Sequence, residues 1–140
     1  MDWKLIFQLS LFGLAMAIAT VFVIPSNTEP AFWLGIFLIC GYIIARRRQT
    51  GRFTHGLVLG LANSVWVTAA HILLFDRYLA GHAQEAAMMK SMPLPDSPRL
   101  MMAIVGPVVG LVSGVIIGLL ALGVGKWIKR PMPPTVRTPA

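Results

Sequence analysis

The chain has 140 residues, of which 56% are hydrophobic and 12% are charged, and its formal net charge is +7. The charged fraction is about half of that in a typical soluble domain, and a domain of this size has too much surface for its volume to bury so many apolar side chains. The composition therefore excludes an ordinary soluble protein and predicts an all-α integral membrane protein. The single cysteine, Cys40, also excludes an intrachain disulfide and a paired-thiol redox enzyme.

Four apolar stretches predict a bundle of four transmembrane helices. At 1.5 Å per residue, a helix of about 20 apolar residues is about 30 Å long, which matches the hydrocarbon core of a bilayer. Pro25 ends the first stretch, whereas Pro30 and Pro98 stand where a proline fits the first turn of a helix. The expected spans are residues 4–24, 30–46, 53–75 and 99–125, within a membrane domain that covers residues 1–130.

The first stretch resembles a secretory signal peptide in two ways. Lys4 precedes it, and the small residues Ala15 and Ala17 have the spacing of a cleavage site. The apolar run, however, continues to Ile24, which is longer than the apolar core of such a peptide. We therefore expect this stretch to remain as the first span.

Basic residues are distributed unequally between the two sides of the predicted bundle. If the four spans alternate in direction, nine of the 12 Lys and Arg residues lie on the side of the two termini and three lie on the other side. The positive-inside rule then predicts cytoplasmic termini, in a plasma membrane such as the bacterial inner membrane. The run Arg46, Arg47 and Arg48 is expected to contact anionic lipid head groups. No aromatic platform accompanies these arginines, so their charge does not indicate nucleic-acid binding.

The segment between the third and fourth spans predicts a short helix on the membrane surface. Residues 77–91 are rich in helix-forming residues, and three prolines after them favour an extended return to the fourth span. Residues 131–140 contain four prolines and are expected to form a disordered cytoplasmic tail. The apolar face of the surface helix is predicted to comprise Leu79, Ala83, Ala86 and Met89.

Small residues recur at every fourth position in the last two spans. They are Gly56, Gly60, Ser64 and Thr68 in the third span, and Gly106, Gly110, Gly114 and Gly118 in the fourth. Such rows let two helix backbones approach closely. We expect the two rows to face each other in the manner of a glycine zipper. In the alternative, the fourth-span row joins copies of the chain in a homo-oligomer or contacts another membrane protein.

Polar side chains inside the spans are candidates for a function, because lipid offers them no hydrogen bonds. The simpler interpretation is that they form hydrogen bonds between helices. The functional interpretation is a polar path along the third and fourth spans, formed by Asn63, Ser64, Thr68, His71 and Ser113.

His71 lies about one turn from the outer end of the third span, at a depth similar to that of Pro107 in the fourth. Proline leaves the carbonyl group of Ala103 without its helical donor. We expect an uncharged His71 to donate a hydrogen bond to that carbonyl and to have a structural role. In the alternative, His71 carries protons or binds a metal together with His82 and Glu85.

No arrangement of residues indicates catalysis, a cofactor or a metal site. The apolar stretches contain no Asp, Glu, Lys or Arg to carry a proton. Methionines crowd the outer side and would suit Cu(I), but adaptable apolar packing explains them more simply. The sequence favours a non-catalytic scaffold or accessory component that assembles through its glycine-rich helices, with a small transporter or channel for a neutral solute as the alternative. The methionines are Met88, Met89, Met92, Met101 and Met102.

Overall fold

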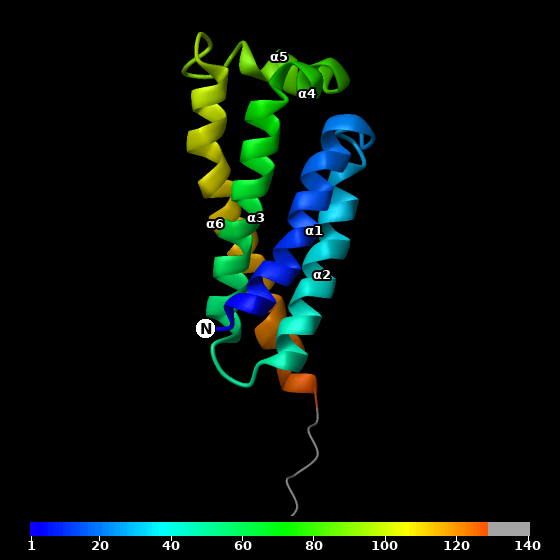
Figure 1. Ribbon diagram of the computed structural model, residues 1–140, viewed down its shortest axis with the longest axis vertical. Coiled ribbons are helices and arrows are strands. Elements are labelled where there is room, and N and C mark those ends of the chain that lie inside the picture. Colours follow the sequence, from blue (N-terminus) through cyan, green and yellow to red (C-terminus); the bar gives the residue numbers. More distant parts are fainter. Residues whose placement is uncertain (129–140) are drawn as a thin grey trace, which may run out of the picture.

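The computed structural model describes residues 1–128, which fold into four long helices and two short ones (Figure 1). This part of the chain contains no strand, so the predicted all-α class is confirmed. Each long helix begins and ends within two residues of its predicted span and is long and apolar enough to cross a membrane. The expected tail, residues 131–140, lies outside the described residues. The long helices are α1 (Trp3–Phe22), α2 (Glu29–Arg47), α3 (Arg52–Leu73) and α6 (Pro98–Trp127), and the short ones are α4 (Phe75–Gly81) and α5 (Ala83–Met89).

Local signals in the sequence determine where the long helices begin. Asp2 caps α1, because its Oδ1 atom accepts a hydrogen bond of 3.0 Å from the Leu5 amide. Pro30 and Pro98 stand in the first turns of α2 and α6, where the missing amide hydrogen has no helical partner in any case. Gly51 precedes α3 with a φ of 67°, a left-handed conformation that glycine adopts without a steric penalty. The short turns between α1 and α2 and between α2 and α3 make these consecutive helices antiparallel (Figure 1).

Helices α3 and α6 form the centre of the bundle. They share the most extensive contact in the molecule, α1 packs on α3, and α2 packs on α6. Direct contact between α1 and α2 is slight. The helices are therefore arranged in the order α1, α3, α6, α2, and α4 and α5 lie across the end of the bundle opposite the N-terminus (Figure 1).

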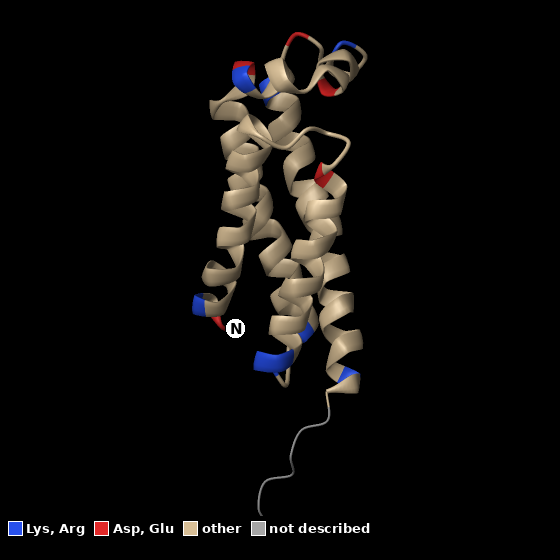
Figure 2. Ribbon diagram, turned by 90° about the vertical axis from the view of Figure 1, so that its right-hand side faces the viewer, with Lys and Arg blue, Asp and Glu red and all other residues tan. Residues whose placement is uncertain are grey.

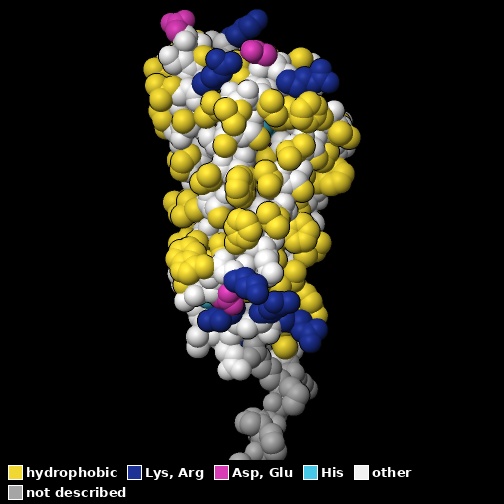
Figure 3. Space-filling model, viewed as in Figure 1, with side chains coloured by type: hydrophobic (Ala, Val, Ile, Leu, Met, Phe, Trp, Pro, Cys, Tyr) yellow, Lys and Arg dark blue, Asp and Glu magenta, His cyan; other side chains and the backbone are white. Residues whose placement is uncertain are grey.

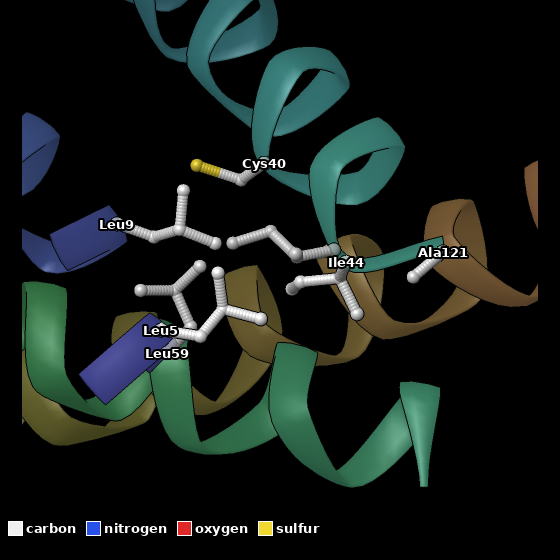
Figure 4. Close-up of a cluster of buried hydrophobic side chains, with 7 residues drawn as sticks. Leu5, Leu9, Cys40, Ile44, Leu59 and Ala121 are labelled. Carbon is white, nitrogen blue, oxygen red and sulfur yellow. The ribbon is translucent and has the colours of Figure 1, made fainter. Parts of the chain in front are cut away.

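A buried apolar core closes the end of the bundle where α1 begins and α6 ends, which we call the terminus end. Gly41 lets α2 approach α6 closely here, because a Cβ atom at this position would lie 2.9 Å from Leu120 Cβ. All four long helices contribute to this core, so the terminus end is tightly packed. Its members are Leu5, Leu9, Cys40, Ile44, Leu59, Ile117 and Ala121 (Figure 4).

Charged side chains gather at the two ends of the bundle (Figure 2), and the face shown in Figure 3 has an apolar band between them. Large hydrophobic side chains are exposed along the bundle, among them Phe7, Leu38 and Val112. An exposed apolar surface of this extent is typical of proteins that contact lipid or another protein.

The surface helix expected over residues 77–91 is divided into α4 and α5 rather than continuous. His82 separates them with a φ of −131° and a ψ of 71°, outside the helical region. Its Nδ1 atom donates a hydrogen bond of 2.8 Å to the Tyr78 carbonyl, so the ring takes the acceptor that the His82 amide would use in a continuous helix. The amide donates instead to the Leu79 carbonyl over 3.2 Å. This local competition ends α4 at Gly81.

Candidate functional site

A chamber of about 350 Å³ lies between α2, α3 and α6, beyond the core and toward α4 and α5. Its lining follows α3 from Gly60 to His71, which is about 16 Å at 1.5 Å per residue. Small-molecule sites in proteins have volumes of roughly 300–1,000 Å³, so the chamber is large enough for a small ligand. The exposed Met88 and the half-buried Glu29 and Glu85 also line it. The chamber therefore communicates with the surface at this end, which we call its mouth.

The structure brings together the five residues of the predicted polar path. Asn63, Ser64, Thr68 and His71 of α3 and Ser113 of α6 all line the chamber. A few polar groups in an otherwise apolar cavity are typical of sites that orient a small organic ligand. The apolar lining includes Trp33, Phe37, Val67, Val105 and Val109.

Asn63 has an unused hydrogen-bonding capacity. Only 3% of its surface is exposed, and neither its Nδ2 nor its Oδ1 atom has a hydrogen-bond partner among the described residues. Gly13 of α1 makes room for the amide, since a Cβ atom there would lie 2.7 Å from Asn63 Cγ. A buried polar group without a partner costs about 1–3 kcal/mol. A ligand that forms hydrogen bonds with this amide would recover part of that cost.

His71 does not form the hydrogen bond to Ala103 that the sequence suggested. Its Nε2 atom lies 3.1 Å from Oγ1 of Thr20 on α1. Because the Thr20 hydroxyl itself donates within α1, His71 is the donor and Thr20 the acceptor. The reason is the rotation of α3: Thr68 abuts Gly106 of α6, and His71, three residues further on, projects about 60° to one side of Thr68. That direction leads to α1 rather than to α6.

Three rings form a stack beside the chamber. The Tyr78 ring centroid lies 4.0 Å from that of His71 and 4.3 Å from that of His82, with interplanar angles of 21° and 23°. Nε2 of His82 is buried without a hydrogen-bond partner among the described residues. Burial raises the pKa of Tyr78 above its ordinary value, and the negative charges of Glu29 and Glu85 raise this pKa further. Both carboxylates therefore act on Tyr78, the middle ring of the stack.

Two carboxylates stand at the mouth. Oε1 of Glu29 accepts a hydrogen bond of 3.0 Å from Nε1 of Trp33, and Oε2 of Glu85 accepts one of 2.7 Å from Oγ of Ser26. Each carboxylate is thus oriented by a neutral donor. The sequence suggests Glu85 only as a metal ligand and does not single out Glu29, because a glutamate before a helix-initiating proline is unremarkable in itself. The two segments are 56 residues apart, and no pattern in them reveals that they meet.

Methionine side chains complete the wall near the mouth. Their flexible, unbranched chains adapt to apolar groups of different shapes. Among residues 1–128, no three His, Cys, Asp or Glu side chains are grouped so as to hold a metal ion, and His71, His82 and Glu85 do not form such a group. The methionines of the wall are Met88, Met89, Met92, Met101 and Met102.

The small-residue rows of α3 and α6 lie against each other within the chain. A Cβ atom added to any of these glycines would overlap atoms of the facing helix. The touching pairs are Gly56 with Gly118, Gly60 with Gly114, Gly110 with Ser64, and Gly106 with Thr68. This contact forms one side of the chamber and occupies the rows, so assembly with another chain would need a different surface.

A cluster of polar groups joins the start of α1 to the turn between α2 and α3. The Asp2 amide donates to Nε2 of His55 over 3.0 Å, so the ring proton is on Nδ1, which donates to a carbonyl of the preceding turn over 2.7 Å. Oδ2 of Asp2 lies 3.7 Å from Nη1 of Arg48. Arg46 and Arg47, the other members of the basic run, are exposed near the end of α2. The sequence does not single out His55, whose role here is to fasten the terminus end.

No protein-family model, curated protein or solved structure matches this chain. The function is therefore inferred from the chemistry of the chamber, because specific sites determine function more closely than the fold that carries them.

Proposed function

We propose that the protein is an integral membrane bundle of four helices that binds a small organic molecule in the chamber, as the loading step of transport. The observation that carries the proposal is the gathering of the five polar side chains around one cavity of about 350 Å³. Of the five, His71 alone forms a hydrogen bond to another helix among the described residues, namely to Thr20 of α1, and Ser64 donates to the Leu61 carbonyl of its own helix. Interhelical bonding therefore explains His71 but not the other four.

The distribution of basic residues supports an orientation in the membrane. Lys4, Arg52 and Lys126 lie at the terminus end together with the run 46–48, and the opposite end carries fewer basic residues. By the positive-inside rule the terminus end is cytoplasmic, and the mouth opens on the outer side of a plasma membrane, the inner membrane in a bacterium. Anionic lipid head groups would then contact Arg46 and Arg47.

The two ends of the chamber differ, which favours a carrier over a continuous pore. The mouth is lined by partly exposed side chains, whereas the apolar core fills the bundle on the cytoplasmic side. A central site that is accessible from one side and closed by packed helices on the other is the arrangement expected for alternating access.

The scaffold or accessory role is the second candidate, and the glycine rows were the reason to expect it. These rows face each other inside the chain, so they offer no surface for a partner. Purification in mild detergent, with a mass measurement, distinguishes the two candidates. A stoichiometric partner protein would favour the accessory role.

Binding inside the chamber is tested with a matched pair of substitutions on α3. Val67 lines the chamber, whereas Val65 is 63% exposed on the outside of the bundle. Val67→Trp should fill the chamber and Val65→Trp should leave it open. We expect calorimetric titration of the neutral probe 4-phenylbutanol into protein in nanodiscs to show one saturable site, with about tenfold weaker affinity in Val67→Trp. Empty nanodiscs correct for partition into lipid, and equal affinities of the two variants would contradict the proposal.

A further inference from the structure

We infer that the chamber selects a positively charged amphipathic ligand, an ammonium group on an apolar body, and that the ammonium group binds between Glu29 and Glu85 at the mouth. This inference rests on the proposed binding function and specifies its substrate class.

The two glutamates are the charged carboxylates of the chamber, and neither Lys nor Arg lines it. The ion pairs found among the described residues involve other carboxylates, those of Asp2 and Asp76, so neither glutamate has a cationic partner there. One oxygen of each is bound to a neutral donor, and the other receives no hydrogen bond from residues 1–128. The carboxylate oxygens that receive no hydrogen bond can each accept one from an ammonium group, which offers several charged N–H donors.

The basic residues at this end of the bundle are Arg77, Lys90 and Arg99, and none of them lines the chamber. The Arg77 guanidinium lies 5.7 Å from the centroid of the Phe22 ring. That of Arg99 lies 4.9 Å from the Phe75 ring centroid and 3.7 Å from a carboxylate oxygen of Asp76. The lining of the chamber therefore holds two carboxylates and no Lys or Arg side chain. Burial raises the pKa of the nearby Tyr78, and the negative charges of Glu29 and Glu85 raise this pKa further.

Helix α2 presents a suitable wall for such a ligand. Glu29, Trp33 and Phe37 follow one another at four-residue spacing and all line the chamber, so a carboxylate is succeeded by two aromatic rings along one face. Aromatic rings attract an ammonium group through their π-electrons and also cover an apolar body. The methionines on the opposite wall adapt to the shape of that body.

Asn63 is an independent sign of a ligand in the same chamber. The residue lines the cavity and is 3% exposed, and neither polar atom of its amide, which lies beside Gly13 of α1, has a hydrogen-bond partner among the described residues. Along α3 it lies eight residues below His71, about 12 Å at 1.5 Å per residue. A ligand whose apolar body ends in a hydrogen-bonding group could therefore contact the mouth and this amide at once.

A bilayer is far less permeable to a charged molecule than to an uncharged one, and this explains why a positively charged ligand needs a carrier. An uncharged apolar molecule crosses a hydrocarbon layer without help, whereas a charged group in that layer is costly. A carrier is therefore useful for the ammonium form of an amphipathic molecule, and two carboxylates at the outer mouth supply the selectivity.

The inference is tested with two probes that differ only in their head group. At pH 7, 4-phenylbutylamine carries an ammonium group where 4-phenylbutanol carries a hydroxyl. We expect the amine to bind the wild-type protein in nanodiscs at least about tenfold more tightly than the alcohol. The double variant Glu29→Gln/Glu85→Gln should bind the two probes with equal affinity. Glutamine keeps an acceptor oxygen for Trp33 and Ser26, and saturable binding of the alcohol by this variant shows that the chamber is intact.

Asp96→Asn is the matched control, because Asp96 is an exposed carboxylate at the same end that does not line the chamber. It should keep the preference for the amine. Equal affinities of the two probes for the wild type would overturn the charge inference and leave the proposed binding function standing. Saturable binding of neither probe would remove the proposed function itself. A preference that survives in the double variant, or that Asp96→Asn abolishes, would place the cation elsewhere and also overturn the inference.

Discussion

Thr20 and His71 show how a buried polar pair is satisfied in an apolar bundle. His71 donates to Thr20 over 3.1 Å, and Thr20 donates to the Ala17 carbonyl over 3.1 Å. Both side chains are buried, so neither can exchange its partner for water. The hydroxyl therefore links the ring of α3 to the backbone of α1.

This pair can be measured with a double-mutant cycle of Thr20→Val and His71→Leu. Each single substitution leaves one buried polar group without its partner and should lower the free energy of unfolding by about 1–3 kcal/mol. The double variant removes both groups and should cost less than the sum, with a coupling of about 0.5–1.5 kcal/mol. Reversible unfolding in mixed micelles provides the measurement. Strictly additive losses would show that the hydrogen bond contributes nothing.

Sequence alone identifies His71 and Asn63 as residues of interest, because polar side chains stand out in an apolar run. It does not identify their neighbours. The partner of His71 depends on the rotation of α3 about its axis, which is set by the contact between Thr68 and Gly106. The nearest residue in depth on another helix was therefore a poor guide to the acceptor.

At the scale of elements, the contact between α3 and α6 depends on the absence of side chains. A Cβ atom at Gly114 would lie 2.6 Å from the Leu57 carbonyl oxygen, and backbone atoms cannot move aside as a flexible side chain can. Gly123, nine residues further along α6, has no atom within 4 Å of such a Cβ atom.

These two glycines give a prediction with an internal control. Gly114→Ala should push α6 away from α3 and lower the free energy of unfolding by about 1–3 kcal/mol. Gly123→Ala should be neutral or stabilise the protein by up to about 1 kcal/mol, since alanine is the better helix former. Thermal unfolding of both variants in the same detergent checks this expectation. Similar midpoints would mean that the helices are not closely packed at Gly114.

The four-residue spacing of small residues is visible in the sequence, so which helices approach closely could be predicted before their geometry was known. The division between α4 and α5 could not. Residues 77–91 have the composition of one helix, and the interruption results from a single ring nitrogen of His82 that competes for the Tyr78 carbonyl. Helix propensities describe each type of residue on average and do not include a side chain that competes with the backbone for one particular carbonyl group.

For the whole molecule, the unequal numbers of Lys and Arg at the two ends of the bundle predict its orientation in a membrane. The four long helices follow from the four long apolar runs of the sequence, each of which is long and apolar enough to cross a membrane. The presence of Glu29 and Glu85 in the lining of one chamber has no such basis in the sequence. It depends on how α2 lies across α6 and on where the chain turns at His82, so the mouth of the chamber was not predictable from the sequence.

Orientation is testable by cysteine labelling of intact cells. In a Cys40→Ser background, Ser91→Cys should react with a membrane-impermeant maleimide added from outside, and Thr50→Cys should react only after the cells are permeabilised. The reason is the excess of Lys and Arg on the side of the termini. The opposite pattern would reverse the proposed orientation, and equal labelling of both positions would show that the protein inserts in two orientations.

Helix α2 has its buried residues near one end only. Cys40, Gly41, Ile44 and Ala45 are buried in the packed end of the bundle, whereas Glu29 stands at the mouth. Glu29 is 12 residues from Gly41, a lever arm of about 18 Å, so a rotation of about 5° at Gly41 displaces Glu29 by about 1.6 Å. Such a rotation moves Glu29 relative to α3 and α6, and the hydrogen bond of 2.7 Å between Ser26 and Glu85 passes part of the motion on to α5. The shape of the mouth therefore depends on the angle of α2.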